Sequence, residues 1–348
     1  MEPARLHEQV IHYRPLAAGR PYTPDTEVFA RFGGGSKILC ADGAGHAAVY
    51  DAEEQSFVAM PAMNSPKGWG HFAFSVSVPL AAARRSDCKD VLSTGEHSDS
   101  VYVLDMTGGK FTNASCFEEL AYRGGRDGWR WRPLPPPPFL RGPEFDVPRG
   151  ASPKYAVVGG GGTTRICVST GPAYAFDGAP PAATYTYDVA SREWSKAGDW
   201  ALQFLGRGEH VPELGVWIGL SSDIYNPYGI YAVDLTGSAF AGGAPPTAQH
   251  VGLDLDPPPP EPKLGDPEWL LEDNALVNLG SGRFCVARFF NHYYEQYTPA
   301  MAVLTGVEVV PSGGAGGDGR QSGDHGGLSL IRHKSQYIMT DGATTRVL

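Results

Sequence analysis

Short runs in which apolar and polar residues alternate recur along the chain. In Tyr185–Trp194 the aromatic residues Tyr185 and Tyr187 alternate with threonines, Asp188 ends the run, and Trp194 begins the next one. A period of two residues is typical of a half-buried β-strand. The pattern therefore predicts a strand, a turn and a second strand.

The same unit recurs elsewhere in the sequence. Each copy is an apolar or aromatic run that ends at an aspartate and is followed by a further strand; the copies are Ala48–Asp51, Val101–Asp105 and Ile230–Asp234, and Ala302–Thr305 is a degenerate one. Together with the tryptophans of the following strands, this unit resembles a blade of a kelch-type propeller. Internal repetition favours a β-propeller, and an unrelated set of hairpins in a β-sandwich is the alternative.

Both ends of the chain hold a spare strand besides the five groups of strands that the pattern predicts. These are Val10–Tyr13 and Gln336–Met339. A propeller must satisfy the open edges of its first and last blades, and pairing the two ends does so. We therefore predict a single all-β domain over residues 1–348, a kelch-like β-propeller of six blades with five as the alternative. Residues 1–36 contribute to its closing blade, and the low-complexity stretch 313–327 is a disordered loop.

Several local expectations follow from the same patterns. Clear strands are predicted at Lys37–Asp42, His46–Asp51 and Ser56–Met60, with the turn signal Asp42-Gly43 between the first two. The run Cys116–Tyr122 is predicted to be a short helix in a long loop between strands. Strands are also expected near Ala201–Phe204 and Val216–Leu220, which leaves the polar residues between them in a turn.

The composition agrees with an all-β chain. Among 348 residues there are 45 glycines and 30 prolines, and charged residues make up 19%. Many short strands joined by tight turns give this balance, whereas long amphipathic helices do not. The formal net charge is −10 with no cluster of Lys and Arg, which argues against binding to nucleic acid.

No apolar run approaches the length of a membrane span, and the first residues hold no apolar signal core. We therefore predict a cytoplasmic or nuclear protein, or one found in both compartments, that is monomeric and does not bind membranes. The five cysteines are odd in number and widely spaced. Cys40, Cys167 and Cys285 lie within apolar runs and are predicted to be buried and reduced.

Candidate catalytic motifs each have a plainer interpretation. The glycine run Gly159–Gly162 leads into the predicted strand Arg165–Thr170, whereas a phosphate-binding loop leads into a helix. His292 and Glu295 have a ligand-like spacing but are better explained as part of a solvated loop. The Gly280–Gly282 segment is too short for a nucleophile elbow. The sequence therefore predicts no catalytic residue, no metal site and no cofactor.

The richest polar cluster is the run from Arg207 to Glu213. Arg207, Glu209, His210 and Glu213 lie beside Gly206 and Gly208, where the chain can turn sharply and display side chains. We predict these four as binding residues. The structural alternative is that Arg207 and Glu209 form a salt bridge or bond to neighbouring backbone. Arg283 and Arg288 are expected to make similar contacts between blades, and Trp69, Trp200 and Trp217 to lie in the core.

A family resemblance rests on longer motifs. These are Trp129–Phe139, Gly198–Ser221, Leu276–Phe290, Ala302–Val309 and Ile331–Ser335, and together they span roughly residues 37–340. They resemble a plant family expanded in grasses that is known only as a domain of unknown function and is often described as kelch-like. The resemblance implies a plant origin. It brings no reaction and no catalytic residue that could be transferred to this chain.

Two function classes remain from the sequence. The first is a non-enzymatic module that binds a protein partner through loops on one face of the propeller, and we predict this class. The alternative is an enzyme or small-molecule binder that uses the central funnel. Charged residues and histidines converging on the propeller axis would favour the alternative.

Overall fold

The computed structural model describes sixteen stretches of the chain. They are residues 2–3, 28–32, 35–42, 44–68, 70–79, 97–106, 115–122, 128–141, 153–160, 163–171, 181–223, 225–236, 243–254, 269–292, 301–312 and 327–339. Every regular element in them is a β-strand except one 3₁₀ turn at Pro138–Arg141. The predicted all-β class is therefore confirmed. Within these stretches no helix is long and apolar enough to cross a membrane.

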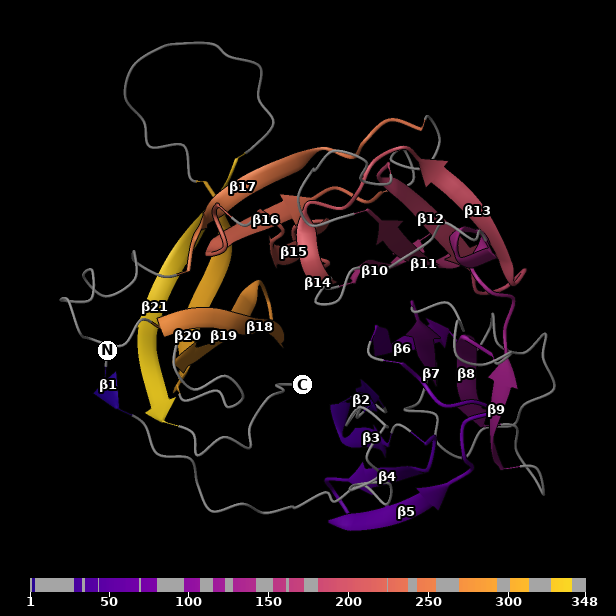
Figure 1. The fold of residues 1–348 in the computed structure, drawn as a ribbon. Helices are drawn as coiled ribbons and strands as arrows, with labels where there is room; N and C mark the ends of the chain where they lie inside the picture. Colours follow the sequence, from indigo (N-terminus) through magenta and orange to yellow (C-terminus); the bar gives the residue numbers. More distant parts are fainter. Residues whose placement is uncertain are drawn as a thin grey trace, which may run out of the picture. The chain divides into compact units, whose positions relative to one another are not determined.

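The chain divides into two compact units. The N-terminal unit comprises residues 10–153, 157–197 and 348, and the C-terminal unit comprises residues 1–9, 154–156 and 198–347. Their strands can be followed in the colours of Figure 1 from indigo to yellow. Each unit is built from antiparallel sheets whose strands mostly follow one another in sequence order.

The N-terminal unit holds three sheets of this kind. The first runs β2 (Val28–Phe32), β3 (Lys37–Ala41), β4 (Ala47–Asp51) and β5 (Ser56–Met60). The second runs β6 (His71–Pro79), β7 (His97–Asp105), β8 (Phe117–Tyr122) and β9 (Trp129–Pro133). The third runs β10 (Lys154–Gly160), β11 (Thr163–Thr170), β12 (Ala183–Asp188) and β13 (Glu193–Gly198).

The C-terminal unit holds two sheets. One group of strands is β14 (Phe204–Val211), β15 (Val216–Ser221), β16 (Gly229–Val233) and β17 (Ala248–Leu253). The first three residues of β10 pair with β14 in parallel, so these strands continue the third sheet into one of eight strands in the order β13-β12-β11-β10-β14-β15-β16-β17. The other contains β18 (Trp269–Gly280), β19 (Arg283–His292), β20 (Met301–Pro311) and β21 (Leu328–Met339). Its last member is β1 (Glu2–Pro3), which pairs in parallel with Gln336 and Tyr337.

Apolar residues of neighbouring sheets form the core of each unit. In the N-terminal unit, Val28, Leu39 and Val49 of the first sheet pack with Val101 and Leu120 of the second. In the C-terminal unit a second cluster joins its two sheets, with members Val211, Ile218, Leu220, Ile230, Phe284, Val286, Val307 and Val309. Burial of such side chains is the main source of stability in a sheet protein.

Three of the four aspartates that end the repeated strands, Asp51, Asp188 and Asp234, hold the turns that follow, whereas Asp105 accepts a hydrogen bond from the backbone N–H of Gly68 at 2.6 Å. The Oδ1 atom of Asp51 accepts hydrogen bonds from the backbone N–H of Glu53 at 3.0 Å and of Glu54 at 3.2 Å. Asp188 does the same for the two residues at 190 and 191, and Asp234 for Thr236. An Asp side chain that bonds its own turn replaces backbone bonds lost at the end of a strand. This explains why the repeat closes with Asp.

The predicted helix at Cys116–Tyr122 is wrong. Phe117–Tyr122 forms β8, which pairs with β7 on one side and β9 on the other. Its first five residues are all buried, so both faces of the strand are covered and no alternation of apolar and polar residues marks it. Tertiary pairing therefore overrides the local preference of Glu118, Glu119 and Ala121 for a helix.

The two ends of the chain are paired as far as the structure describes them. Glu2 is the partner of Gln336 in the sheet, so a strand from the N-terminal segment does join the strand at Gln336–Met339. The predicted strand Val10–Tyr13 and most of the predicted loop 313–327 lie outside the described residues. Closure into a propeller and the number of blades stay predictions.

The cysteines are only partly as predicted. Cys40 and Cys167 are buried free thiols, whereas Cys285 is half-buried. The thiol of Cys285 is free as predicted, but its predicted burial is wrong because neighbouring residues of a strand point to opposite faces. Phe284 and Val286 take the core face of β19, and Cys285 lies on the other.

Candidate functional site

The predicted binding residues lie mainly on a strand and not in a turn. Arg207, Glu209 and His210 belong to β14, and only Glu213 lies in the turn that leads to β15. The placement of the first three in a turn was therefore wrong. The reason is a bulge: the pairing of β14 with β15 shifts between Leu205 and Glu209, and the residues between them face a different partner.

Glycines make this bulge possible. Gly206 has a φ of +66°, a conformation that side chains with a Cβ rarely adopt. At Gly208 and Gly219 an added Cβ would lie 2.3 Å and 2.4 Å from the ring of Phe204, which is fully buried. The ring thus occupies the space that the two glycines leave open, and β10 takes up the bulged residues as its parallel partner.

Arg207 and Glu209 contact each other. The Nε atom of Arg207 lies 3.1 Å from Oε1 of Glu209, and the two side chains are 37% and 16% exposed. The salt bridge that the sequence raised as the structural alternative is therefore confirmed. Among the described residues the Nε–H group has no hydrogen-bond partner, so its contact with Glu209 is an ion pair without hydrogen-bond geometry.

The opposite register position on β10 is Tyr155. Burial raises the pKa of Tyr155 to about 12, while the charge of Arg207 lowers it and that of Glu209 raises it. The two opposite charges beside the buried hydroxyl therefore act on its pKa in opposite directions. Arg207 and Glu209 thus behave as parts of the framework around Tyr155.

His210 is held differently. Its ring stacks on the indole of Trp217, with ring centroids 4.2 Å apart and planes at 25°, because the two residues are partners in the β14–β15 hairpin. Trp217 is buried, whereas His210 and Glu213 are exposed. Burial against the strand lowers the pKa of His210, and the Glu213 carboxylate acts in the opposite direction. The His210 imidazole and the Glu213 carboxylate are therefore exposed, and the buried indole of Trp217 supports the imidazole ring.

Sequence reasoning missed Lys154 in this region. It is the register partner of Gly206, only 8% exposed, and burial lowers the pKa of its amine. No ion-pair partner of Lys154 is found among the residues that the structure describes. No local sequence pattern predicts the burial of Lys154, because a parallel pairing between distant segments leaves no pattern in either segment. The hairpin partner Trp217, by contrast, follows from the tight turn at Pro212–Gly215.

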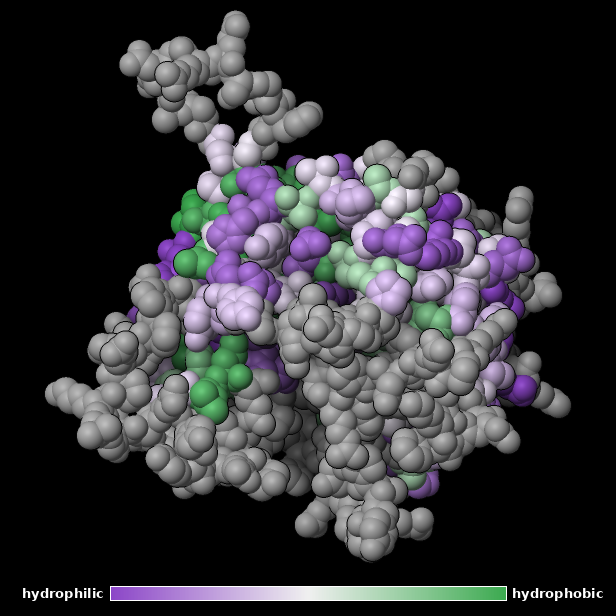
Figure 2. Space-filling model, turned by 45° about the horizontal axis from the view of Figure 1, so that its top comes forward, coloured by the Kyte–Doolittle hydropathy of each residue, from purple (hydrophilic) through white to green (hydrophobic). Residues whose placement is uncertain are grey.

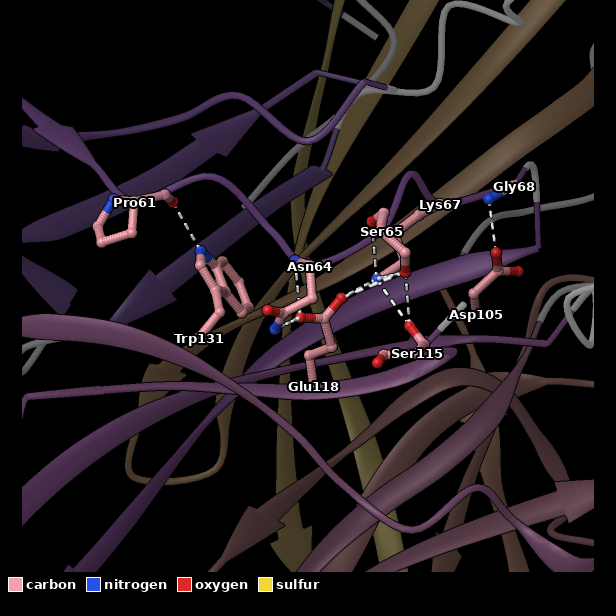
Figure 3. A network of polar contacts seen from close by, with 9 residues as sticks. All are labelled: Pro61, Asn64, Ser65, Lys67, Gly68, Asp105, Ser115, Glu118 and Trp131. Atoms are coloured by element: carbon pink, nitrogen blue, oxygen red, sulfur yellow. Dashed lines mark hydrogen bonds and ion pairs between the residues drawn. The ribbon is translucent and has the colours of Figure 1, made fainter. Parts of the chain in front are cut away.

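A second polar cluster lies inside the N-terminal unit (Figure 3). The ammonium of Lys67 contacts the Glu118 carboxylate and donates to the backbone oxygens of Ser65 and Ser115, each at 3.0 Å. Glu118 in turn accepts from the backbone N–H of Asn64 at 3.0 Å. Both charged side chains are fully buried. This network fastens the segment after β5 onto β8, and its burial marks it as structural.

A third cluster runs across the second sheet of that unit. Tyr102 and Glu119 are cross-strand partners, as are Glu119 and Arg132. The hydroxyl of Tyr102 donates to Glu119 at 2.9 Å, and the Arg132 guanidinium contacts the other carboxylate oxygen. The ring of Phe117, on the same face, packs edge-on against Tyr187 at 5.0 Å. The Tyr187 hydroxyl is buried, and no described residue forms a hydrogen bond with it.

The described stretches contain no group of three or more His, Cys, Asp or Glu side chains that could hold a metal ion. On the face drawn in Figure 2, hydrophobic residues at the surface lie among hydrophilic ones. The most exposed polar groups of the predicted site, His210 and Glu213, offer hydrogen bonding and ion pairing to a bound surface. That chemistry is suited to recognition.

A family comparison covers nearly the whole chain. The family described as "Protein of unknown function (DUF1668)" matches residues 1–339. No relative was found among curated proteins.

Solved structures give remote likenesses. The β-propeller domain of Cps50 (Swd1) from Myceliophteria thermophila aligns at a TM-score of 0.35 and 10% identity, covering 81% of this chain and 69% of that one. The WD40 domain of SCAP from fission yeast aligns at 0.35 and 11%, covering 89% and 63%. Hydrazine synthase of Kuenenia stuttgartiensis aligns at 0.33 and 10%, covering 84% and 80%. This chain thus spans less than two thirds of the SCAP chain, and likenesses of this size carry no argument about its function.

Proposed function

We propose that this chain, which belongs to the DUF1668 family of proteins of unknown function, is a non-enzymatic module that binds a partner protein. The contact surface is the end of β14 and the turn after it, with His210 and Glu213 as the touching residues. The observation that carries the proposal is the stacking of an exposed His210 on a buried Trp217. A side chain fixed in this way loses little conformational freedom when a partner binds.

Arg207 and Glu209 have a supporting part in this proposal. Their ion pair and their position beside the buried Tyr155 make them framework residues that keep the bulge in shape. The contact surface is then a strand end and one turn, in place of a set of loops. All four residues that the sequence singled out thus contribute. His210 and Glu213 touch the partner, and Arg207 and Glu209 keep the bulge of β14 in shape.

The type of β-fold is also part of the proposal. The repeated antiparallel sheets and their Asp-held turns support blades of a kelch-like β-propeller, closed through the pairing of β1 with β21. A plant origin, which the family resemblance implies, and a cytoplasmic or nuclear location complete the proposal.

Affinity capture from plant tissue tests this function. Wild-type protein, the double variant H210A/E213A and the control E193A, an exposed carboxylate on β13, are compared by quantitative mass spectrometry. We expect one set of proteins to be retained by wild type and control and lost from the double variant. Each substitution should change stability by less than about 1 kcal/mol, as surface changes usually do. Equal retention by all three proteins would contradict the proposed surface.

Lys154 supports a second candidate, a small-molecule binder. A lysine that is 8% exposed, with a pKa lowered by burial, is a group that an acidic or carbonyl-bearing ligand would engage. Native mass spectrometry of the purified protein should then show a bound small molecule that the variant K154M lacks. Identical spectra for the two proteins would remove this candidate.

A further inference from the structure

We propose that the outer edge of β5 is a docking strand for a partner protein. The partner contributes an extended segment with apolar residues at its centre and Lys or Arg at its flank, and this segment adds to the first sheet as a further strand. The surface lies in the N-terminal unit and does not rest on the contact surface proposed for β14.

The position and exposure of β5 support this role. It is the last strand in the order β2-β3-β4-β5, as Figure 1 shows, and no described strand pairs with its outer side. Four of its five residues are exposed, with Phe57 at 49% and Val58 at 50%. Because consecutive residues of a strand point to opposite faces, apolar side chains are available on both sides of this edge.

The outer strands β9, β13 and β17 carry features that prevent edge pairing, and β5 does not. Strand β9 has Arg130, Arg132 and a final proline, and β13 has Glu193 and Lys196. The pairing of β17 with its neighbour is interrupted by a register shift between Ile230 and Tyr231. Charges, proline and bulges are the usual means by which proteins protect an edge.

Strand β5 reads Ser-Phe-Val-Ala-Met without a charge or a proline. Its register with β4 is unbroken from Asp51 opposite Ser56 to Ala47 opposite Met60. A regular and uncharged edge of this kind is a template for another strand. Added strands gain affinity from main-chain hydrogen bonds and specificity from alternate side chains.

The turn next to this edge indicates the charge of the partner. Glu53 and Glu54 are exposed there, and the Asp51 carboxylate fixes both by accepting their backbone N–H groups. Asp51 itself is neutralised by Lys37, and among the described residues neither glutamate has an ion-pair partner. A basic flank on the added strand complements them. A second copy of this chain would bring a net charge of −10 and the same two glutamates, so a basic segment fits better.

A peptide-binding experiment tests the proposal on the full-length chain. The probe is a fluorescein-labelled peptide of sequence Lys-Val-Thr-Val-Thr-Val-Lys, and its counterpart carries Glu at both ends. We expect fluorescence anisotropy to detect binding of the Lys-flanked peptide alone, weaker at high salt. The variant E53Q/E54Q should bind at least about threefold more weakly, as expected for surface ion pairs. Equal binding of the two peptides would overturn the proposal.

Substitutions in the strand itself separate docking from folding. V58K places a charge on the edge and should weaken binding at least tenfold while thermal melting stays close to wild type. Backbone N–H groups of an edge strand point alternately toward the neighbouring strand and outward, so one of the two variants V58P and A59P removes an outward-pointing N–H. That variant should fold and fail to bind the peptide. Undiminished binding by V58K, or by whichever proline variant folds, would contradict the proposal.

Two further measurements show which molecule binds to the edge of β5. The variant H210A/E213A should bind the peptide as wild type does, so that failure of the β14 surface is distinguishable from failure of this one. Sedimentation of the wild-type chain should show no dimer that V58K abolishes. Such a dimer would mean that the edge receives a second copy, and the partner segment proposed here would be wrong.

Discussion

Arg288 and Asp254 form a bidentate ion pair inside the C-terminal unit. Nε of Arg288 donates to one carboxylate oxygen at 2.8 Å and Nη2 donates to the other at 2.7 Å. Both residues are fully buried, and the guanidinium lies 5.1 Å from the ring centroid of Tyr228. The pair joins β19 to the residue that follows β17, and so connects the two sheets of this unit. The sequence predicted a connecting role for Arg288.

Removal of one partner from this pair should be severe. Asp254→Asn leaves a buried guanidinium without a counter-charge, and we expect the free energy of unfolding to fall by about 3–5 kcal/mol. Urea unfolding followed by circular dichroism measures the change. The control R283A alters an exposed arginine on the same strand and should change stability by less than about 0.5 kcal/mol. A small effect of D254N would mean that the pair is hydrated in solution.

The Lys67–Glu118 pair offers a test of coupling. Lys67→Met leaves the buried carboxylate unpaired and should cost about 3–5 kcal/mol. The double variant K67M/E118Q should recover at least half of that loss, because a glutamine carries no charge and still accepts the Asn64 N–H group. A double-mutant cycle in urea gives the coupling energy. Additive losses would show that the two charges do not interact.

Much of the sheet structure could be predicted from alternating residues and turn signals, and the failures have physical causes. The strand at Ser56–Met60 was predicted with its observed bounds. The helix predicted at Cys116–Tyr122 is wrong, because a strand buried on both faces shows no alternation of apolar and polar residues. Gly206 and Gly208 suggested a turn, whereas they serve a bulge whose partner, β10, is distant in sequence.

The candidate site was predictable only as a list of polar residues. The ion pair of Arg207 and Glu209 is local and was foreseen as an alternative. Burial of Lys154 and Tyr155 beside them depends on a parallel pairing that no short pattern encodes. The docking edge proposed for β5 likewise rests on contrast with the other outer strands, which requires knowledge of which strands are at the edges.

The thiols should differ in reactivity. Cys40 and Cys167 are buried and should resist labelling in the native protein, whereas Cys285, half-buried, should be modified. Burial, reinforced by Asp105, raises the pKa of Cys116 to about 11 from 9.0. Because the thiolate is the reactive form, the labelling rate of Cys116 should rise about tenfold per pH unit between pH 8 and 10. Mass spectrometry of labelled peptides measures all four rates.

The same pKa shift makes stability depend on pH. In the unfolded chain Cys116 ionises near pH 9, while in the folded chain it keeps its proton to about pH 11. Between these two pH values the unfolded state binds fewer protons than the folded state, so the contribution of Cys116 to stability is lost as the pH rises. Cys116→Ala should flatten the decrease in melting temperature across this window. An unchanged slope in that variant would contradict the assignment.

Tyr187 should tolerate the loss of its hydroxyl. Its Oη atom is buried with no hydrogen-bond partner in the part of the chain that the structure describes, so Tyr187→Phe removes an unsatisfied group and should raise stability by about 1 kcal/mol. The matched control Tyr102→Phe removes a hydroxyl that donates to Glu119 at 2.9 Å and should lower stability by about 1.5–3 kcal/mol. Thermal and urea unfolding both report the sign. A loss of stability in Y187F would show that the hydroxyl is bonded in solution.

His210 should titrate below its ordinary range. Burial of the ring on Trp217 disfavours the imidazolium, so the pKa of His210 lies below 6.5 despite the opposing charge of Glu213. The unfolded chain therefore binds a proton first as the pH falls below about 6.5, and stability decreases until the native pKa is reached. An NMR titration of the ring protons measures the midpoint directly. Glu213→Gln removes the carboxylate that raises the value and should move the midpoint further down, whereas Glu209→Gln, whose carboxylate pairs with Arg207, should leave it in place. A midpoint above 6.5, or a shift in E209Q equal to that in E213Q, would show that His210 is not held on Trp217 as the structure describes.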